Sequence, residues 1–289
     1  MLRKKLYFCN TYFEWELEQK KDITIEEGLR AHPLFFQLHH LPLLFAEKTL
    51  LAPEIQNKTE FANFELVSYA PSRSVQKWAQ EKNIPYNIPP LDLVKTLTSK
   101  IFSFENAPQL PGSAILYNAK EATAWLAKGP FPKVLKTPFG FAARGHTILQ
   151  HANFDCSKLT FPLIGEPWVK RQLDFSMHFE IGEEIRCVGK TLMQNDQRGS
   201  FLSCKTGADI PEVNHLPLLE KIQEMGFFGP ISIDSFVYDG GIHPVVEINP
   251  RHTMSSIACK IGVPIKFTYG KDGDLLPSGY AKNLTIVKL

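Results

Sequence analysis

Residues 230–249, with the sequence PISIDSFVYDGGIHPVVEIN, constrain the fold most, because two apolar runs flank a central glycine pair. Gly240 and Gly241 suit the tight turn of a β-hairpin, since glycine readily adopts the positive φ angles that such turns require. A two-residue turn on this pair predicts that Asp239 lies opposite Ile242 in the ladder. The segment is therefore expected to form two antiparallel strands.

The same register brings polar side chains together on one face of the hairpin. It places Asp234 directly opposite Glu247, and Asn249 points to the same face, whereas Ile233 and Ile248 pair on the opposite, core face. Facing carboxylates repel, so the pair needs a compensating cation, and oxygen ligands of this kind suit Mg²⁺ first. A register shift of one residue would break the alignment and leave an ordinary solvated strand face as the alternative.

The composition is that of a folded protein. The chain has 289 residues, enough for one large domain or two ordinary ones, with 44% hydrophobic and 21% charged residues. A net charge of +2 gives no electrostatic reason to expect a nucleic-acid or membrane partner. No apolar run approaches the roughly 18 residues that cross a bilayer. Five scattered cysteines without a CxxC spacing predict reduced thiols in a cytoplasmic protein.

Strand and helix signals alternate in the first hundred residues. KLYFCN (5–10) and FELVSYAPS (64–72) predict buried strands, and a helix follows with Ser72 as its N-cap. This order indicates a small α/β unit. The start of the helix, after YAPSR, could also hold an anionic substrate, although a plain capped helix is the simpler interpretation.

Further elements are expected along the rest of the chain. A helical segment is predicted around residues 91–104, and KVLKTPFGFAARGHTIL (133–149) predicts two strands joined by a glycine-containing turn. Alternating strands are expected around an IGEE turn at 181–184. Thr253 is expected to cap a last helix.

The hairpin resembles the metal-binding end of the ATP-grasp superfamily. In that family one strand supplies an acidic metal ligand, and the next ends in Glu-x-Asn, often followed by Pro-Arg. The corresponding segments are SIDSF and VEINPR. The resemblance implies Asp234, Glu247 and Asn249 as ligands of Mg²⁺, with Mn²⁺ as an alternative ion. It also implies Arg251 as a catalytic contact to phosphate or carboxylate.

Two upstream segments resemble the nucleotide-binding part of the same family and occur in the same order. VLKTPFGFAARGHTIL is similar to a strand-end lysine followed by a flexible phosphate loop, which makes Lys136 a second catalytic candidate. EPWVKRQLDFS is similar to a hinge strand that contacts adenine and ribose. The nucleotide contacts that the resemblance implies are Lys100, Lys136, Gly140, Arg144, Gly145, Glu166, Val169 and Asp174. A surface helix lysine and a strand-edge acid are the alternatives for Lys100 and Asp174.

One position departs from the family pattern. Many members carry an arginine two residues before the first metal-binding acid, where this chain has Ser232. Another cation then has to stabilise the transferred phosphoryl group. Arg251 is the first candidate, and Arg186 and Lys205 follow.

The resemblance implies an α/β (α+β) fold. Residues 1–98 would form a small N-terminal pre-ATP-grasp α/β domain, and residues 99–289 the ATP-grasp domain. Within the latter, 99–165 would carry the phosphate loop and 166–289 the metal-binding hairpin, as two α+β subdomains that clamp the nucleotide.

The implied activity is that of an ATP-dependent ligase. Such an enzyme activates a carboxylate as an acyl phosphate, which an amine, or a thiol, then attacks. The resemblance implies a small-molecule carboxylate and an amine as substrates. Because members of the family are often dimers, it also implies a homodimer. The alternatives are an ATP-grasp kinase and a nucleotide-binding module without turnover. The second alternative stands because the chain has Ser232 where many family members have an arginine.

Overall fold

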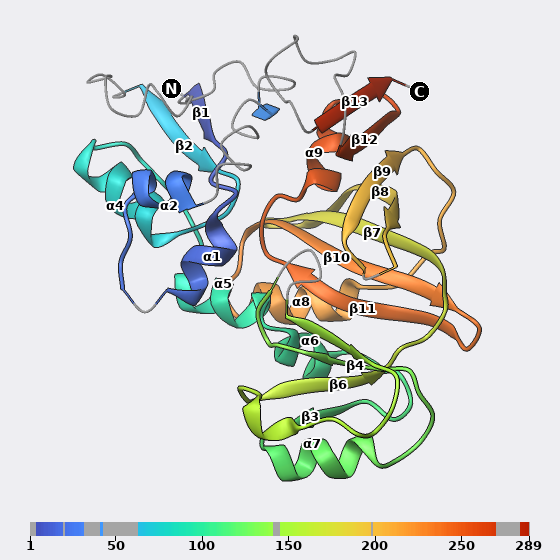
Figure 1. Cartoon of the computed structure of the whole chain (residues 1–289). Coiled ribbons are helices and arrows are strands. Elements are labelled where there is room, and N and C mark those ends of the chain that lie inside the picture. Colours follow the sequence, from blue (N-terminus) through green and yellow to red (C-terminus); the bar gives the residue numbers. More distant parts are fainter. Residues whose placement is uncertain are drawn as a thin grey trace.

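The computed structural model of the protein describes residues 4–19, 21–31, 41–42, 63–140, 145–197, 199–269 and 284–288. Over these residues the strands form a two-stranded, a four-stranded and a seven-stranded sheet. Figure 1 shows the two-stranded sheet and its helices beside the seven-stranded sheet, with the four-stranded sheet below them. None of the helices in this part of the chain is long and apolar enough to span a membrane.

The N-terminal unit is built on two parallel strands with helices packed beside them. Its elements are β1 (Lys4–Phe8), α1 (Phe13–Glu18), α2 (Ile25–Ala31), β2 (Phe64–Ser68) and α4 (Arg73–Glu81). Leu6 and Leu66 are partners in the ladder and pack against Val75 and Trp78 of α4. Both predicted strands and the helix that begins after Ser72 are therefore confirmed.

Two helices connect this unit to the remaining sheets. The predicted helical segment is divided into α5 (Leu91–Thr98) and α6 (Lys100–Asn106). The break is at Ser99, which has an extended backbone and whose hydroxyl accepts a hydrogen bond from the Ile101 N–H at 3.3 Å. Because Ser99 caps α6, Lys100 becomes the first residue of a new helix.

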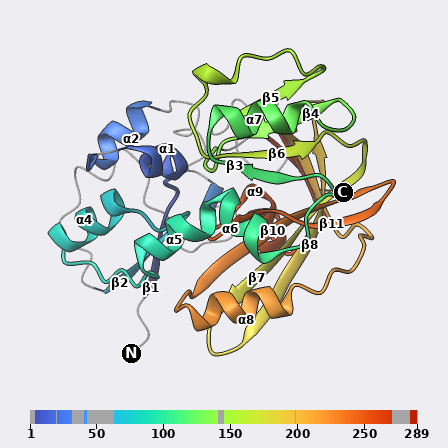
Figure 2. The same ribbon diagram turned by 90° about the horizontal axis from the view of Figure 1, so that it is seen from below.

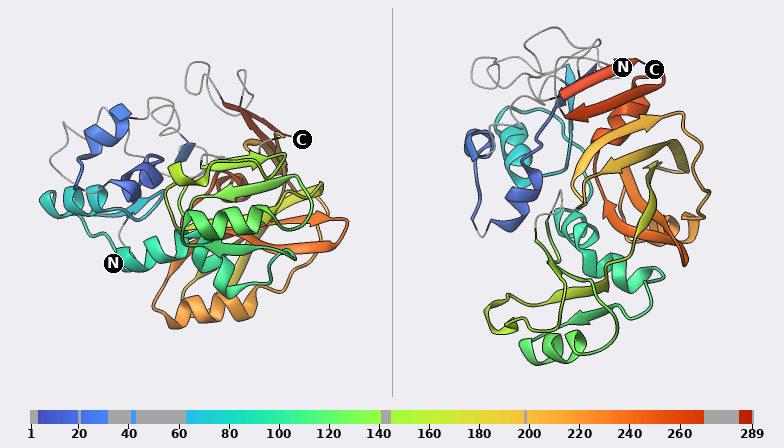
Figure 3. Two further views of the ribbon diagram at one scale, coloured as in Figure 1. Left: turned by 60° about the horizontal axis from the view of Figure 1, so that its bottom comes forward. Right: turned by 45° about the vertical axis from the view of Figure 1, so that its right-hand side comes forward.

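The four-stranded sheet is antiparallel and has the strand order β3-β6-β4-β5. Its elements are β3 (Ala114–Leu116), α7 (Ala119–Leu126), β4 (Lys133–Lys136), β5 (His146–Leu149), the 3-10 helix η3 (Cys156–Lys158) and β6 (Leu163–Pro167). Figure 2 and Figure 3 show α7 alongside this sheet. Leu126 of α7 packs against Leu135 and Leu163, which anchors the helix to the sheet.

The seven-stranded sheet has the order β11-β10-β7-β8-β9-β12-β13. Its elements, with the helices between them, are β7 (Arg171–Ile181), β8 (Ile185–Asn195), β9 (Phe201–Thr206), α8 (Leu216–Glu224), β10 (Gly229–Tyr238), β11 (Gly241–Asn249), α9 (Met254–Lys260), β12 (Ile265–Tyr269) and β13 (Leu284–Lys288). One face forms the core with α8, which lies along the sheet in Figure 2. Leu219 and Ile222 of this helix belong to the same core cluster as Ile233 and Ile248 of the sheet. The helix α9 contacts β8, β9 and β12, and Thr253 caps it as predicted.

The hairpin of β10 and β11 has the predicted register at its acidic end but a different turn. Asp234 pairs with Glu247, as expected. However, Tyr238 pairs with Gly241, so the turn is formed by residues 239–240 and the predicted turn on the glycine pair was wrong. The pairing is irregular between Asp234 and Phe236, where β11 has more residues than β10. These extra residues bring Asp234 back to its predicted partner, Glu247. That bulge contains Pro244, which has no N–H to donate to a ladder.

Candidate active site

A cleft lies between the four-stranded and the seven-stranded sheet. It consists of two adjoining cavities of about 1150 and 130 Å³ that share part of their lining. Residues of β4, β5, β7, β10 and β11 line the smaller cavity, which therefore faces both sheets. The sequence-predicted residues Lys100, Lys136, Gly140, Asp174, Asp234 and Glu247 all line it.

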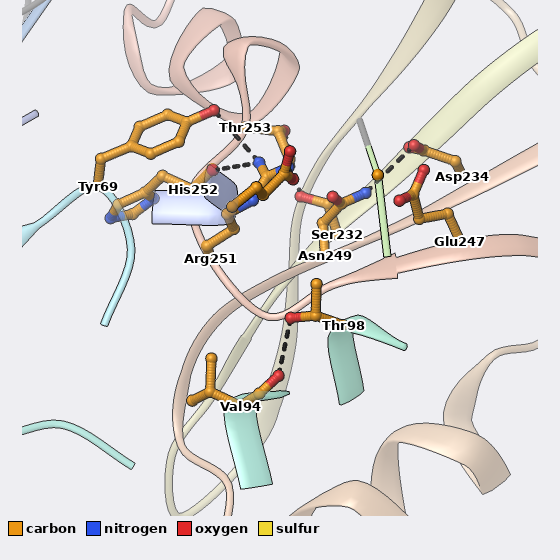
Figure 4. A network of polar contacts seen from close by, with 12 residues as sticks. Tyr69, Val94, Thr98, Ser232, Asp234, Glu247, Asn249, Arg251, His252 and Thr253 are labelled. Atoms are coloured by element: carbon orange, nitrogen blue, oxygen red, sulfur yellow. Dashed lines mark hydrogen bonds and ion pairs between the residues drawn. The ribbon is translucent and has the colours of Figure 1, made fainter. Parts of the chain in front are cut away.

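Strand alternation gathers polar side chains on the cleft face of the seven-stranded sheet. Ser176, Asp234 and Glu247 lie at neighbouring positions across β7, β10 and β11. One step further along, Ser232 lies opposite Asn249, and Asn249 Nδ2 donates to Asp234 Oδ2 at 3.2 Å. Figure 4 shows Asn249 beside Ser232 and close to the Asp234–Glu247 pair. The three predicted metal ligands are thus brought together.

The two facing carboxylates differ in their proton affinity. Burial, together with the charge of Glu247, raises the pKa of Asp234 to about 7. Burial also acts to raise the pKa of Glu247, but the ammonium of Lys100 outweighs it, and the net pKa is lowered. Lys100 Nζ lies 2.9 Å from Glu247 Oε1 and also donates to Gly140 O at 2.8 Å. With 7% of its side chain exposed, Lys100 is a cleft residue and not a surface lysine.

The oxygen donors of Asp234, Glu247 and Asn249 fit a magnesium ion that is also held by the phosphates of a bound substrate. In the described ranges, no three His, Cys, Asp or Glu side chains are grouped so that they could hold a metal ion. Two carboxylates and one amide oxygen are nevertheless enough, because Mg²⁺ commonly binds one or two carboxylates together with substrate phosphates and water. Burial and the charge of Glu247 raise the pKa of Asp234, and a bound cation would offset both effects.

Lys136 of β4 pairs with Glu166 of the adjacent β6. Lys136 Nζ is 2.5 Å from Glu166 Oε2, and both side chains are buried. Burial favours the neutral form of Glu166, but the attraction of Lys136 is stronger and holds the pKa of that carboxyl below its usual value. Lys136 has three N–H donors, so it can keep this ion pair and still donate to a phosphate in the cleft.

The predicted phosphate loop begins and ends at glycines. Gly140 and Gly145 have φ angles of +138° and +79°, which other residues rarely adopt. A Cβ atom on Gly145 would lie only 2.1 Å from Thr137 Oγ1, so the base of the loop has no room for a side chain. Thr137 N donates to Gly145 O at 3.1 Å and ties the two ends together. Arg144 lies outside the described residues.

The hinge segment lines the wide part of the cleft. Val169 and Asp174 both line the larger cavity. Arg171 was not predicted, yet it lines both cavities, pairs with Asp174 at 2.8 Å and lies 4.4 Å above the ring of Phe236. Its position three residues before Asp174 in the hinge segment is the one sequence signal that could have suggested it.

His146 contributes an unsatisfied polar atom to the same cleft. Its Nδ1 is buried and has no hydrogen-bond partner among the described residues. Burial, reinforced by the charges of Lys136 and Lys100, lowers the pKa of His146 to about 4, so the ring is neutral at pH 7. The residue as a whole lines both cavities, so a small movement of its ring could bring this nitrogen to a polar ligand.

Arg251 lies beyond the metal-binding end, where the N-terminal unit meets β11. Its guanidinium forms an ion pair with Glu14 of α1 and donates to Tyr69 Oη at 3.2 Å and to His252 O at 3.0 Å. Figure 4 shows Tyr69 and His252 around Arg251, on the far side of Asn249 from Asp234. Sequence reasoning missed Glu14 and Tyr69, because no local pattern links residues so far apart in the chain.

The position of the missing arginine is filled by a buried hydrogen-bond network. Ser232 Oγ lies 2.8 Å from His178 Nδ1, and His178 Nε2 lies 3.0 Å from Thr191 Oγ1. Burial lowers the pKa of His178 to about 3, so this network carries no positive charge. Arg186 and Lys205 are exposed and are absent from the lining of both cavities. Among the described residues, the lysine and arginine side chains that line the smaller cavity are those of Lys100, Lys136 and Arg171.

The start of α4 is occupied by a side chain of the protein itself. Glu16 Oε1 accepts from Ser74 N at 2.7 Å, and Glu16 Oε2 accepts from Ser74 Oγ at 2.8 Å. Ser72 caps the same turn by accepting from Val75 N. The interpretation as a plain capped helix is therefore the right one, because the anion position is already filled.

Comparisons at the level of sequence find no relative. No protein-family model matches the chain, and no curated protein is similar to it.

Solved structures do resemble it over nearly its whole length. One is a protein from Archaeoglobus fulgidus described as a candidate ATP-grasp superfamily protein, with a TM-score of 0.54, 12% identity and 99% of each chain covered. N5-carboxyaminoimidazole synthetase from Staphylococcus aureus, complexed with ADP, has a TM-score of 0.53 and 10% identity, with 92% of this chain and 82% of that chain covered. The biotin carboxylase domain of the Hydrogenobacter thermophilus 2-oxoglutarate carboxylase, solved as a dimer with MgADP and bicarbonate, has a TM-score of 0.57 and 11% identity, with 93% and 75% covered.

Proposed function

The chain has the ATP-grasp fold, and on this premise we propose that it is an ATP-dependent ligase that activates a carboxylate as an acyl phosphate. The observation that carries the proposal is the meeting of Asp234 and Glu247 with two lysines in one cavity between two sheets, with Asn249 hydrogen-bonded to Asp234. Carboxylates and ammonium groups in a single cavity suit a polyphosphate with its cation.

We infer that ATP lies along the cleft from the hinge to the hairpin. The Val169 backbone and Glu166 would contact adenine, and Asp174 would contact the ribose hydroxyls. Lys136, the loop between Gly140 and Gly145 and the buried nitrogen of His146 would contact the phosphates. Two of the similar structures contain ADP or MgADP, which supports the choice of nucleotide.

Most of the chemistry of the first step is positioning and neutralisation of charge, because the transition state of phosphoryl transfer is loose and anionic. An oxygen of the substrate carboxylate attacks the γ-phosphorus, and the bond to the β–γ bridging oxygen breaks as ADP leaves. Bound Mg²⁺, held by Asp234, Glu247 and Asn249, would neutralise phosphate charge. Lys100 of α6 and Lys136 of β4 add two ammonium groups to the lining of the same cavity.

In the second step a neutral amine attacks the acyl carbon, phosphate leaves with the electron pair of the C–O bond, and the attacking nitrogen loses a proton to solvent. Arg251 would offer its planar fork of N–H donors to the substrate carboxylate in exchange for its ion pair with Glu14. A thiol as the nucleophile, Mn²⁺ as the metal, a homodimer and a cytoplasmic location stay predictions.

The test is an assay for ADP and hydroxamate with Mg²⁺, ATP, hydroxylamine and a panel of carboxylic acids. Hydroxylamine traps an acyl phosphate as a hydroxamate. We expect one acid to yield hydroxamate, and we expect Glu247→Gln to reduce its formation by about 100-fold or more, because the variant loses charge at the phosphates. Glu220→Gln, an exposed change on α8, serves as the matched control and should behave as wild type.

The outcomes separate the competing functions. Release of ADP without hydroxamate would indicate a kinase or an uncoupled ATPase. An active Glu247→Gln enzyme would refute the metal assignment, and absence of turnover with every acid would favour a nucleotide-binding module.

A further inference from the structure

Among the described residues, the lysine and arginine side chains that line the smaller cavity are each paired with a carboxylate. The pairs are Lys136 with Glu166, Arg171 with Asp174 and Lys100 with Glu247. The last pair is different, because Glu247 is also a proposed metal ligand. The ammonium group of Lys100 and a bound Mg²⁺ ion therefore need the same carboxylate.

Two oxygen atoms of the protein hold the ammonium group of Lys100. Its Nζ donates to Glu247 Oε1 at 2.9 Å and to Gly140 O at 2.8 Å. The backbone N–H of Lys100 donates to Pro138 O at 2.9 Å, so the first residue of α6 is fixed close to Gly140. The side chain is buried. Lys100 thus supplies Glu247 with a positive charge from within the protein.

A metal ion on Glu247 and the ammonium group of Lys100 would repel each other, because both would lie at one carboxylate. If Lys100 leaves Glu247, its buried charge keeps only the neutral carbonyl of Gly140 as a partner, which is a costly arrangement. An anionic ligand in the smaller cavity removes this cost, because its oxygens accept charge-assisted hydrogen bonds from Lys100. The phosphates of a nucleotide are such a ligand, and Lys100 lines the cavity in which we place them.

On the basis of the proposed function, we propose that Lys100 couples the binding of Mg²⁺ to the binding of the nucleotide. Without nucleotide, the ammonium group of Lys100 neutralises Glu247 and opposes the binding of the metal ion. With nucleotide, this group donates to phosphate oxygens and leaves Glu247 to Mg²⁺. Because an ammonium group has three hydrogens, Lys100 can keep its bond to Gly140 O while it exchanges Glu247 for a phosphate.

The exchange makes the cleft specific for the complex of metal and nucleotide. A metal ion alone has to bind against the charge of Lys100, and a nucleotide alone meets a Lys100 that is held by Glu247. Coupling of this kind is reciprocal, so Mg²⁺ strengthens the binding of the nucleotide by the same factor as the nucleotide strengthens the binding of Mg²⁺. The coupling can therefore be measured from either ligand.

The first measurement is the dissociation constant of ADP, by calorimetric titration of the full chain in the presence of EDTA and in the presence of saturating Mg²⁺. The ratio of the two constants is the gain in ADP affinity that Mg²⁺ causes. We expect this gain to be smaller in Lys100→Met than in wild type by about tenfold or more, because the variant has no ammonium group to pass from Glu247 to the phosphates. The attraction between Mg²⁺ and ADP in solution is the same for both proteins and cancels in the comparison. An equal or larger gain in the variant would overturn the inference.

The second measurement is the binding of Mg²⁺ to the protein without nucleotide, by calorimetric titration with Mg²⁺ alone. Lys100→Met should bind the ion about tenfold or more tightly than wild type, because no ammonium group competes for Glu247. A purely structural role of Lys100 predicts the opposite sign, since a damaged site binds its metal more weakly. Equal or weaker binding in the variant, or binding too weak to measure, would overturn the inference.

Two further variants serve as controls. Lys120→Met removes an exposed ammonium group on α7 that lines neither cavity, and it should behave as wild type in both titrations. Lys100→Gln keeps a donor for Gly140 O but has no charge. It replaces the methionine variant if that protein fails to fold in a thermal unfolding assay, and the same changes are expected of it.

Failure of this inference differs from failure of the proposed ligase activity, because the titrations need no acid substrate. An equal gain in wild type and variant would overturn the inference and leave the ligase standing. A smaller gain in Lys100→Met, without hydroxamate from any acid, would support the inference and favour a nucleotide-binding module over a ligase. Absence of ADP binding to the wild type, with and without Mg²⁺, would overturn both.

Discussion

At the scale of single residues, neighbouring carboxylates differ in charge because their partners differ. Glu247 has the ammonium of Lys100 at 2.9 Å. Asp234 accepts a hydrogen bond from the neutral amide of Asn249 at 3.2 Å and lies opposite the negative charge of Glu247. Burial and this repulsion raise the pKa of Asp234 to about 7. Asp234 is thus the group whose proton a bound cation has to displace.

We therefore expect the binding of Mg²⁺ to weaken as the pH falls through 7. Mg²⁺ binds the deprotonated carboxylate, so a raised pKa makes proton and metal compete in this range. The dissociation constant should rise by about tenfold from pH 8 to pH 6, as for one proton with a pKa near 7. Calorimetric titration with Mg²⁺ and ADP at pH 6, 7 and 8 measures it.

Asp234→Asn is the control for this pH dependence, since comparison with wild type cancels the titration of the nucleotide itself. The variant should bind Mg²⁺ more weakly but lose the dependence that is due to Asp234. An equal pH dependence in both proteins would show that another group is responsible.

At the scale of elements, the phosphate loop is shaped at its base. Gly145 combines a positive φ with a close approach to Thr137, and the backbone bond from Thr137 N to Gly145 O, 3.1 Å long, brings the two ends of the loop together. The strands β4 and β5 continue the same pairing, with Lys136 opposite His146. The loop thus extends a hairpin whose first strand ends in the proposed phosphate lysine.

Gly145→Ala is expected to destabilise the protein by about 1–3 kcal/mol, because the residue is held in a strained conformation and its new methyl group meets Thr137. Turnover should fall as well, since the base of the loop must shift. Chemical denaturation and the ADP assay measure the two effects. Gly112→Ala is the matched control, because Gly112 has a φ of +87° but no atom within 4 Å of an added Cβ. A loss of stability no larger than that of the control would exclude the contact as its cause.

At the scale of the whole molecule, the sheets bury several histidines that remain neutral. Burial lowers the pKa of His178 to about 3 and those of His146, His215 and His243 to about 4. In an unfolded chain these groups titrate near pH 6.5. Between these values the unfolded chain binds more protons than the folded one, so acid favours unfolding. Asp234 acts in the opposite direction, because its pKa is raised.

We expect the free energy of unfolding to fall as the pH drops below about 6.5, with His178 accounting for about 2 kcal/mol of the loss between pH 7 and pH 5. His178→Gln should have a lower free energy of unfolding than wild type at pH 7. Between pH 7 and pH 5 its free energy of unfolding should fall by about 2 kcal/mol less than that of wild type. Urea denaturation at both pH values measures the difference. The exposed His151→Gln serves as control, and an equal acid loss in His178→Gln and wild type would contradict the assignment.

Local rules explain which parts of the fold and the site could be predicted. The assumed two-residue turn on Gly240 and Gly241 placed Asp234 opposite Glu247 and Ile233 opposite Ile248, and both pairs are present. The register held even though the turn lies one residue earlier, because the bulge near Pro244 compensates. A shift by one residue would move the acids from the cleft face to the apolar core face, which disfavours that alignment.

The sequence by itself thus determined both strands of the N-terminal unit, the caps at Ser72 and Thr253 and the acidic end of the hairpin, because hydrogen bonding and side-chain alternation act over a few residues. Only the tertiary structure decided the partners of the buried charges. Lys100 meets Glu247 across 147 positions of the chain, and Arg251 meets Glu14 across 237. A buried charge requires an opposite charge or a hydrogen bond, but nothing in its own neighbourhood states which distant residue will supply it.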